Sequence, residues 1–372
     1  MVRASRMSAP APFPKIPPQR RARLLDPPTG PVRVVIDTDT ANEIDDQFAL
    51  MWALQSPDRI RIEAVLAEPY SFAHHRPELL AAAARLESQD EPEPENAAID
   101  AFSGWARRLA EAGRDVRDVE FVDPPEGMER SYSEILRVYD RAGADPDGLV
   151  FRGAARYMPA PDEPVDSPAV RRLIELALEP SDDPLYVVAI GCVTNVASAI
   201  VLEPAIIDRI VVLWTSGYPT WSPRSNTDSL NLVQDVPASR ILFESGVPLI
   251  YFPGYYIGAQ LRLSLPEMER WVQGRGPAGD FLHELYTNNP LHEQRAIDDH
   301  FGRTWVMWDM ITIAWLIEPA WVPTGLVPTP TLDSELRWIP QEGEQRLMRE
   351  AHGIDRDAIF RDFFRKLDAG AR

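Results

Sequence analysis

Short apolar runs alternate along the chain with longer segments in which apolar residues recur at helical spacing. The apolar runs are nearly continuous and rich in Val, Ile and Leu, a pattern typical of parallel strands buried on both faces. They cover residues 32–37, 61–67, 148–153, 185–191, 209–214 and 247–252. Helices are predicted between them, over residues 45–55, 77–88, 128–143, 167–178, 194–202 and 237–245. The alternation predicts a doubly wound α/β domain, in which helices flank a mostly parallel central sheet.

Three segments interrupt this rhythm. Residues 1–30 are basic and rich in Pro and Ala, and they lack the apolar centre of a secretory signal, so a flexible tail is expected unless it docks. Residues 88–127 begin with the acidic, Pro-rich SQDEPEPENAAID and are interpreted as a surface insertion. Residues 255–305 predict short helices that form a cap region. Residues 31–372 are otherwise expected to form a single domain.

The charge and the cysteine count narrow the classes of function. The 372 residues include 38 Lys and Arg against 57 Asp and Glu, a net charge of −19. Nucleic acid and anionic membranes both require basic surface, so neither is an expected partner. Cys192 is the sole cysteine of the sequence, and no apolar run approaches the ~20 residues of a membrane span. A cytoplasmic location is therefore expected.

The stretch VVIDTDTANEIDDQFAL (34–50) concentrates negative charge directly after an apolar run. Asp37 and Asp39 share one face where the first strand ends, at the sheet edge where open α/β sheets bind ligands. Asp45 and Asp46 open the following helix, whose dipole favours negative charge. An ordinary N-cap role for Asp45 and the common acidity of strand-end loops would account for one or two of these aspartates. Four converging carboxylates repel unless a cation lies among them, which predicts a site for Ca²⁺ or Mg²⁺.

Two familiar acidic loops serve as alternatives. An EF-hand loop requires Glu at its twelfth position, where counting from Asp37 gives Phe48, so that pattern fails. The residues DTDTA (37–41) come close to the D-x-D-x-T/V motif of haloacid dehalogenase-type phosphatases. That interpretation leaves Asp45 and Asp46 unexplained, and it is kept as an alternative.

The acidic stretch resembles the opening motif of the inosine-uridine-preferring nucleoside hydrolase family, strand–D-x-D-P-G-x-D-D–helix. Here the loop is two residues longer and lacks Pro-Gly. Three more segments follow in the family's order: AIGCVTNVASAI (189–200) is similar to G-P-L-T-N-x-A, SLNLVQDVPASRILFES (229–245) to E-x-N-x-x-x-D-P-x-A-A, and VMWDMITIAWLIEP (306–319) to the late H-D-x-x-A helix. The resemblance covers about residues 31–325, and its motifs are specific when taken together and in order.

The resemblance implies a Ca²⁺-dependent enzyme that hydrolyses the N-glycosidic bond of ribonucleosides, and a homo-oligomer of two or four chains. It implies that Ca²⁺ is held by Asp39, Asp46, Asp309 and the backbone carbonyl of Ile190, with Asp37 supporting them from behind. Asp39 would also act as the general base that takes a proton from the attacking water.

The resemblance also implies a substrate side, on which Asn42, Asp45 and Asn231 bind the ribose. Ser229 stands where the family has Glu, so ribose binding is expected to differ there, with neighbouring Asp228 as a substitute. Trp308 stands where many members carry the His that protonates the leaving base.

Purine-preferring members have Trp-Asp at this position and stack the base on the indole, which implies a preference for purine nucleosides here. The alternative for Trp308 is an ordinary core residue. A non-catalytic ribose- or sugar-binding module on the same fold is the alternative to an enzyme.

Overall fold

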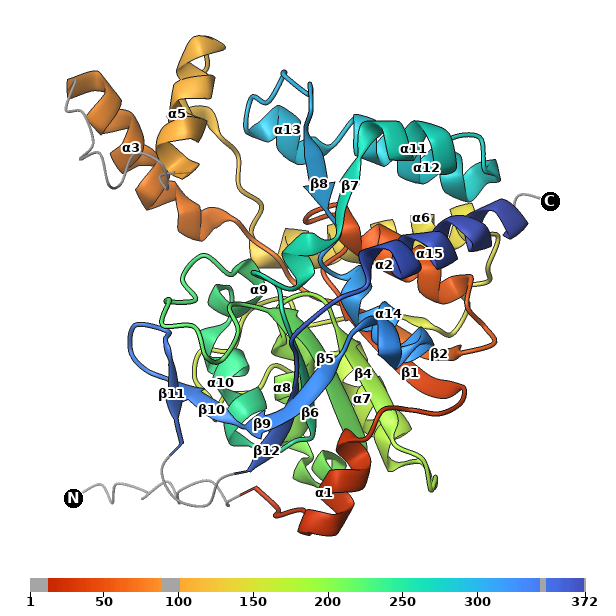
Figure 1. Ribbon diagram of the computed structural model, residues 1–372. Coiled ribbons are helices and arrows are strands. Elements are labelled where there is room, and N and C mark those ends of the chain that lie inside the picture. The colour runs from red at the N-terminus through yellow and green to blue at the C-terminus, as the bar shows by residue number, and fades with distance from the viewer. Residues whose placement is uncertain (1–12, 89–100, 342–345, 371–372) are drawn as a thin grey trace, which may run out of the picture.

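An eight-stranded sheet forms the centre of the computed structural model, which describes residues 13–88, 101–341 and 346–370 (Figure 1). Its strands in spatial order are β3 (Val150–Arg152), β2 (Ile60–Ala67), β1 (Val32–Thr38), β4 (Leu185–Ala189), β5 (Ile210–Ser216), β6 (Leu249–Pro253), β12 (Leu347–Ala351) and β9 (Thr324–Pro328). All neighbouring pairs are parallel except β12 and β9. The chain order reverses direction at β1 and β4, so the predicted doubly wound α/β fold is confirmed.

Helices cover both faces of the sheet. One layer contains α2 (Asp45–Leu54), α6 (Pro124–Ala142) and α14 (Met310–Ile317), and the other contains α7 (Pro168–Leu178), α8 (Thr194–Leu202) and α10 (Val236–Glu244). Val34, Val35 and Ile36 of β1 are fully buried between the layers. Continuous apolar strands are the expected result of a sheet that is covered twice.

The six strands and six helices predicted from the apolar pattern are all present, and their ends shift by at most four residues. The largest shift is at α6, which begins at Pro124 because the Asp123 side chain accepts a hydrogen bond from the Glu126 amide and caps the helix. Asp235 caps α10 in the same way, by accepting a hydrogen bond from the Ala238 amide.

The C-terminal part of the sheet was not predicted. β12 pairs in parallel with β6 and antiparallel with β9, and so it extends the sheet by two strands. Its sequence, LMREA, places two adjacent charged residues between apolar ones and is too short to stand out. The same region adds the ribbon of β10 (Pro330–Leu332) and β11 (Trp338–Pro340), and α15 (Arg356–Gly370), which packs on α12.

The N-terminal segment docks on the domain over residues 13–30, which is the exception that the prediction of a flexible tail allowed. Helix α1 (Pro18–Leu25) buries Leu24 and Leu25. The guanidinium of Arg21 donates hydrogen bonds to the carbonyls of Gly246 and Leu347. Residues 1–12 lie outside the described part of the chain.

The predicted insertion, residues 88–127, contains a helix that packs on the helix before it. Helices α3 (Arg76–Ser88) and α5 (Ala101–Glu111) pack together and project beside the cap (Figure 1). They share a small core of their own, separate from the main one, with Leu79, Trp105 and Leu109 at its centre. Most of the acidic, Pro-rich part of the insertion falls in 89–100, outside the described residues.

The cap over residues 255–305 is helical as predicted, with an added two-stranded ribbon. Its elements are β7 (Arg262–Ser264), α11 (Leu265–Trp271), α12 (Gly276–Thr287), α13 (Pro290–Gln294) and β8 (Thr304–Val306), where β7 and β8 pair antiparallel. The remaining short helices are α9 (Leu230–Val233), η1 (Ala73–His75), η2 (Val116–Asp118), η3 (Pro204–Asp208), η4 (Gly258–Gln260) and η5 (Pro319–Trp321).

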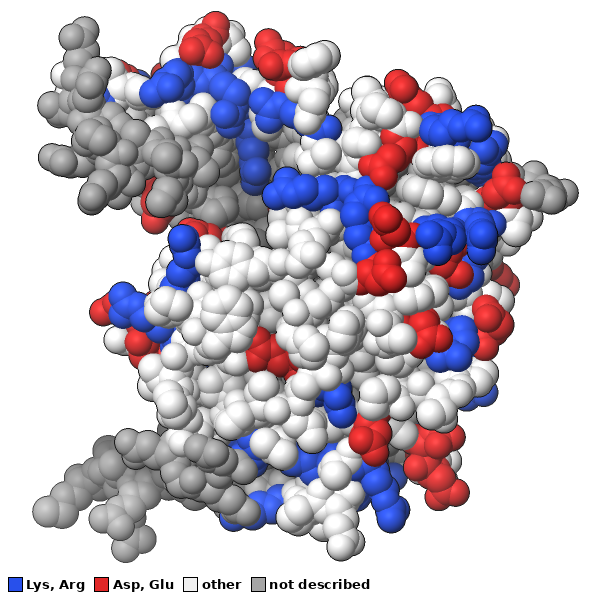
Figure 2. Space-filling view, viewed as in Figure 1, with Lys and Arg blue, Asp and Glu red and all other residues white. Residues whose placement is uncertain are grey.

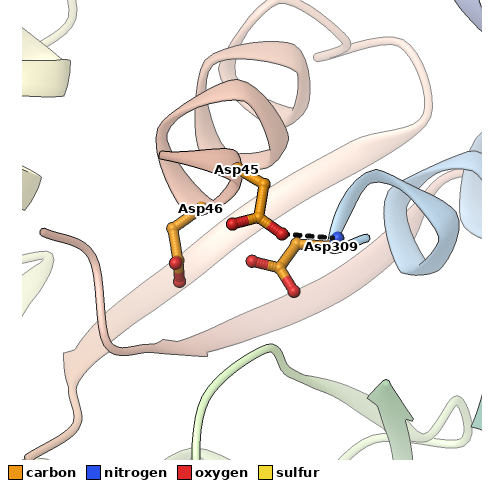
Figure 3. Close-up of side chains that lie close together, drawn as sticks. All are labelled: Asp45, Asp46 and Asp309. Atoms are coloured by element: carbon orange, nitrogen blue, oxygen red, sulfur yellow. Dashed lines mark hydrogen bonds between the residues drawn. The ribbon is translucent and has the colours of Figure 1, made fainter. Parts of the chain in front are cut away.

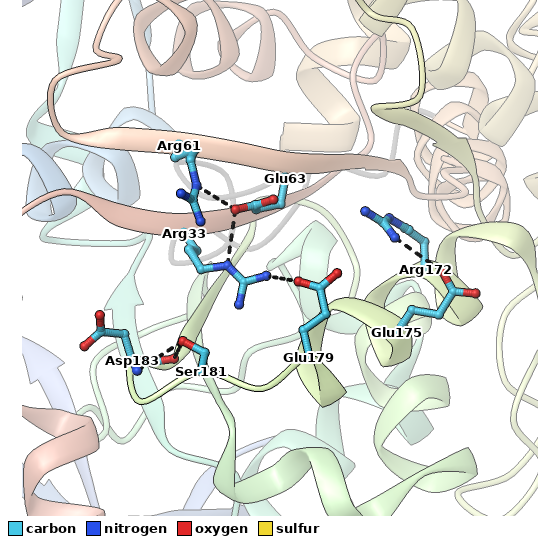
Figure 4. Close-up of polar contacts among 8 residues, drawn as sticks. All are labelled: Arg33, Arg61, Glu63, Arg172, Glu175, Glu179, Ser181 and Asp183. Atoms are coloured by element: carbon cyan, nitrogen blue, oxygen red, sulfur yellow. Dashed lines mark hydrogen bonds and ion pairs between the residues drawn. The ribbon is translucent and has the colours of Figure 1, made fainter.

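The amino ends of the central strands carry ordinary ion pairs. Arg33 of β1 contacts Glu63 at 3.2 Å and Glu179 at 2.5 Å, and Arg61 shares Glu63 at 2.7 Å (Figure 4). Acidic and basic side chains are similarly intermixed over the face shown in Figure 2. In the described ranges no helix is long and apolar enough to cross a membrane. Buried acidic residues, Asp39, Asp45, Asp46 and Asp309, lie instead at the opposite, carboxyl end of the sheet.

Candidate functional site

A pocket of about 590 Å³, including its mouth, opens at the carboxyl ends of β1 and β4. This is the point where the strand order reverses, and it is where open α/β sheets bind ligands. Its lining includes most of the residues predicted for the site: Asp39, Asn42, Asp45, Asp46, Ile190, Asn231, Trp308 and Asp309. Segments separated by more than 260 residues along the chain therefore meet in one cavity.

Three aspartates form the tightest part of the site. Asp45 and Asp46 project from the first turn of α2 toward Asp309, which immediately precedes α14 (Figure 3). Each offers one carboxylate oxygen within 4.8 Å of the other two. The backbone amide of Asp309 donates a hydrogen bond to Asp45 Oδ2 at 3.3 Å, and Thr38 Oγ1 donates to Asp46. These contacts leave several carboxylate oxygens free to bind a ligand.

Asp39 lies on the wall of the same pocket but outside this three-aspartate cluster. Its Oδ2 accepts hydrogen bonds from Asn42 Nδ2 at 2.9 Å and Gln234 Nε2 at 3.5 Å. Gly191 makes room for it, because a Cβ there would lie 2.9 Å from the Asp39 carboxyl carbon. The structure thus groups Asp45, to which the resemblance gives a ribose contact, with Asp46 and Asp309, and places Asp39 beside the group.

Burial and mutual repulsion disfavour the charged forms of these carboxyls. Burial raises the pKa of Asp39 to about 8, against the hydrogen bonds from Gln234 and Asn42. Burial, and to a smaller extent repulsion by neighbouring carboxylates, raises the pKa of Asp45, Asp46 and Asp309 well above the usual value. A cation among them would reverse this balance by favouring the charged forms.

The donor set fits a hard divalent cation. The pocket lining supplies carboxylate and carbonyl oxygens, and the described residues that line it include no Lys, Arg or His. The carbonyl oxygens of Ile190 and Thr215 face Asn231, whose Nδ2 lies 3.2 Å from each. Oxygen ligands of this kind suit Ca²⁺ or Mg²⁺ rather than a soft metal.

Asp37 lies behind the pocket and does not line it. It is fully buried, and its Oδ1 accepts a hydrogen bond from Asn195 Nδ2 at 3.0 Å. Burial raises its pKa to about 7. Glu68, at the end of β2, faces Asp37 and also accepts a hydrogen bond from the Asn195 amide at 2.7 Å, where α8 begins. The sequence analysis missed Glu68, because no nearby residue marked it as part of the site.

Trp308 is half-buried and lines the pocket, so it is not a core residue. Gly254 and Gly258 lie against its indole, since a Cβ at these positions would be in ordinary van der Waals contact with Trp308 Cδ1, at 3.8 and 3.4 Å. Tyr255 lines the same pocket and stacks on Tyr218 with 4.4 Å between ring centroids. The sequence analysis did not single out Tyr255.

Ser229 is occupied by structural hydrogen bonds. Its Oγ accepts from the Gly217 amide at 2.7 Å and lies 2.9 Å from Ser216 Oγ. Asp228, the predicted substitute, lines the pocket with an exposed side chain. Glu43, in the lengthened loop after β1, lines the pocket as well. The sequence analysis gave Glu43 no role.

Comparison with known proteins identifies the family to which these features belong. Residues 34–358 match the family described as inosine-uridine preferring nucleoside hydrolase. The match continues past residue 325, where the resemblance by motif ended, and includes β9 and β12.

Individual relatives are more distant. The pyrimidine-specific ribonucleoside hydrolase RihA of Citrobacter koseri is 29% identical over 169 residues, covering 43% of this chain and 52% of that protein. The chain therefore spans about half the length of the curated relatives it matches. A purine-preferring ribonucleoside hydrolase from Gardnerella vaginalis has a TM-score of 0.62 at 19% identity, covering 91% of this chain and 99% of that one. An inosine-uridine preferring nucleoside hydrolase from Bacillus anthracis has a TM-score of 0.56 at 16% identity, with the same coverage. These structures share the fold.

Proposed function

The chain belongs to the inosine-uridine preferring nucleoside hydrolase family, and we propose that it hydrolyses the N-glycosidic bond of ribonucleosides to ribose and free base, with purine nucleosides preferred. The observation that carries the proposal is the meeting of Asp45, Asp46 and Asp309 in a pocket at the carboxyl edge of the sheet. A phosphatase of the haloacid dehalogenase type is set aside, because the family match spans residues 34–358, a range that includes Asp45, Asp46 and Asp309.

Ca²⁺ is the proposed cofactor. Asp39, Asp46, Asp309 and the Ile190 carbonyl would hold it, and Asp45 is close enough to Asp46 and Asp309 to contribute. When bound, the ion would supply positive charge that orients a water molecule and the ribose hydroxyls and lowers the pKa of that water. Its charge would also let the neighbouring carboxyls ionise together.

Asp39 is the proposed general base. The amide groups of Asn42 and Gln234 hold its carboxylate, and Gly191 gives it space at the pocket wall. In this position it would take a proton from the attacking water. Asp37 lies two residues earlier, accepts a hydrogen bond from Asn195 and supports the end of the strand from behind the pocket.

The ribose contacts are assigned to Asn42, Asp45 and Asn231. The two hydrogen bonds from Asn231 Nδ2 fix its side chain, and its Oδ1 has no partner among the described residues and remains available to a hydroxyl. As the bond to the base breaks, the sugar becomes oxocarbenium-like, and nearby carboxylates would stabilise that charge. Trp308 would stack on the departing base.

The proposal includes a homo-oligomer of two or four chains in the cytoplasm. Sedimentation velocity measures the first directly, and a monomer at assay concentration would contradict it. No residue of the pocket is assigned to another chain, so the assay below does not depend on this part.

A reducing-sugar assay on a panel of ribonucleosides tests the proposal. Protein stripped of metal with a chelator should release no ribose, and added Ca²⁺ should restore release. Asp39→Asn should be inactive, whereas Asp58→Asn, at an exposed position in the turn after α2, should match the wild type. Saturable nucleoside binding by the Ca²⁺-loaded wild type without ribose release would instead indicate the sugar-binding module.

A further inference from the structure

The pocket carries more negative charge than one divalent cation offsets. Six carboxylates line it: Asp39, Glu43, Asp45, Asp46, Asp228 and Asp309. No Lys, Arg or His belongs to the described lining. With one divalent cation present, up to four negative charges remain, and a low-dielectric pocket of one sign concentrates ligands of the opposite sign.

Two hydrogen-bond acceptors in the loop after β1 have no partner among the described residues. They are Asn42 Oδ1, on a side chain that is only 7% exposed, and Glu43 Oε2. A buried acceptor without a protein partner requires an explanation, and water, an ion or a ligand can complete its hydrogen bonds. Because both residues line the pocket, a donor or a positive charge on the substrate can satisfy them.

The loop that carries these acceptors is held in one conformation. Ala41 adopts a φ of 81°, a left-handed conformation that is costly for a residue with a Cβ. The Asn42 amide donates to Asp39 O at 3.0 Å, and its side chain donates to Asp39 Oδ2 at 2.9 Å. Arg295 approaches Glu43 from the cap, but in the part of the chain that the structure describes the two form no ion pair. The guanidinium of Arg295 packs over the rings of Phe72 and Trp105 instead. Glu43 is thus left to the pocket.

Aromatic side chains complete the surroundings. Trp308 and Tyr255 line the same pocket as Glu43, and Tyr255 is fixed by its stacking on Tyr218 and by its hydroxyl, which donates to Asp228 O at 2.6 Å. The faces of indole and phenol rings attract cations, most strongly where water is excluded.

We propose that this site selects ribosides whose base is itself cationic, such as N-ribosylpyridinium compounds and 7-alkylated purine ribosides, with Glu43 as the residue that determines the selectivity. The inference rests on the proposed function and names its substrate class. In such a substrate the C1′–N bond breaks and its electron pair neutralises the ring, so the base leaves neutral and needs no proton. Water oxygen bonds to C1′, and its released proton passes through Asp39 to solvent.

The kinetic test compares 7-methylguanosine, at a mildly acidic pH where its ring is cationic, with guanosine in Ca²⁺-loaded protein. The wild type should have a KM at least about tenfold lower for the cationic substrate. Glu43→Gln keeps the size and removes the charge, so it should raise that KM about tenfold and change the KM for guanosine much less. Glu269→Gln, an exposed glutamate of α11, controls for the loss of one surface charge. Equal KM shifts for both substrates, or none, would overturn the selectivity.

A binding test separates this inference from the hydrolase proposal. 1-Methylnicotinamide and nicotinamide differ mainly in charge, and calorimetry with Ca²⁺-loaded protein measures both without turnover. The wild type should bind the cation about tenfold more tightly, and Glu43→Gln should lose the difference. Equal affinities in the wild type would refute the selectivity even if ribose is released from nucleosides. Cation-selective binding without ribose release from any riboside would refute the hydrolase proposal and leave the selectivity standing.

Discussion

Binding of Ca²⁺ should release protons from the aspartate cluster. The carboxylate oxygens of Asp45, Asp46 and Asp309 lie within 4.8 Å of one another. At an effective dielectric constant of ~20, each pair of charges at that distance repels by about 3 kcal/mol. Three pairs amount to about 10 kcal/mol, which is comparable to the whole stability of a folded domain, about 5–15 kcal/mol. The metal-free site therefore cannot hold three charges at neutral pH.

Burial and repulsion raise the pKa of all three carboxyls well above the usual value, so bound protons neutralise them in the metal-free protein. Ca²⁺ binds carboxylates in their charged form, and binding should displace about one to three protons per ion near pH 7. Titration calorimetry with Ca²⁺, repeated in buffers that differ in their enthalpy of ionisation, gives this number as the slope of the observed enthalpy.

Variants identify where the protons come from. Asp309→Asn removes one titrating group and one ligand, so it should release fewer protons and bind Ca²⁺ at least tenfold more weakly. Asp58→Asn, at an exposed position, should leave the proton number unchanged. If the wild type bound Ca²⁺ with the same enthalpy in every buffer, the carboxyls would already be ionised, and the electrostatic reasoning for the cluster would be refuted.

Three further predictions concern the same pocket. Asp39→Asn should lower kcat by about two or more orders of magnitude, in line with the loss of a general base. Steady-state kinetics with Asp58→Asn as the control measures this, and full activity in both variants would refute Asp39 as the general base. Trp308→Ala should lower kcat/KM for a purine nucleoside by about one to two decades, which corresponds to ~1–3 kcal/mol of stacking, and should affect 4-nitrophenyl riboside much less. Trp271→Ala, which changes an exposed tryptophan outside the pocket, is the control. Equal losses of kcat/KM on both substrates would contradict stacking. In the metal-free protein, burial raises the pKa of Asp37 to about 7 and that of Asp39 to about 8, whereas the unfolded value is about 3.9. The stability that these two groups contribute is therefore complete below the unfolded pKa and is lost as the pH rises through 7 and 8. Melting curves should therefore show the chelated protein less stable near pH 8 than near pH 5, with a smaller difference when Ca²⁺ is present.

The apolar pattern alone determined the central strands and their parallel arrangement. β1, β4 and β5 are buried on both faces, so their sequences are mostly apolar, and that run is visible without any tertiary information. β12 escaped notice because LMREA pairs with β6, almost one hundred residues earlier in the chain, and a five-residue segment with two charged residues has no local signal for such a partner. The docking of α1 was hidden for the same reason, since its buried Leu24 and Leu25 are covered by distant residues.

The acidic loop likewise predicted a cation site from local charge, because four aspartates so close in sequence cannot be far apart in space. The sequence could not show which of the four aspartates lie together in the cluster and which lies beside it. Asp45 and Asp46 share a helix start, and only the packing of α14 against α2 brings Asp309 to them rather than to Asp39. The unpartnered state of Glu43 and Asn42 is also a tertiary property, because it depends on which side chains fail to reach them. Local sequence thus determines which groups are offered at the end of β1, and packing decides which of them meet.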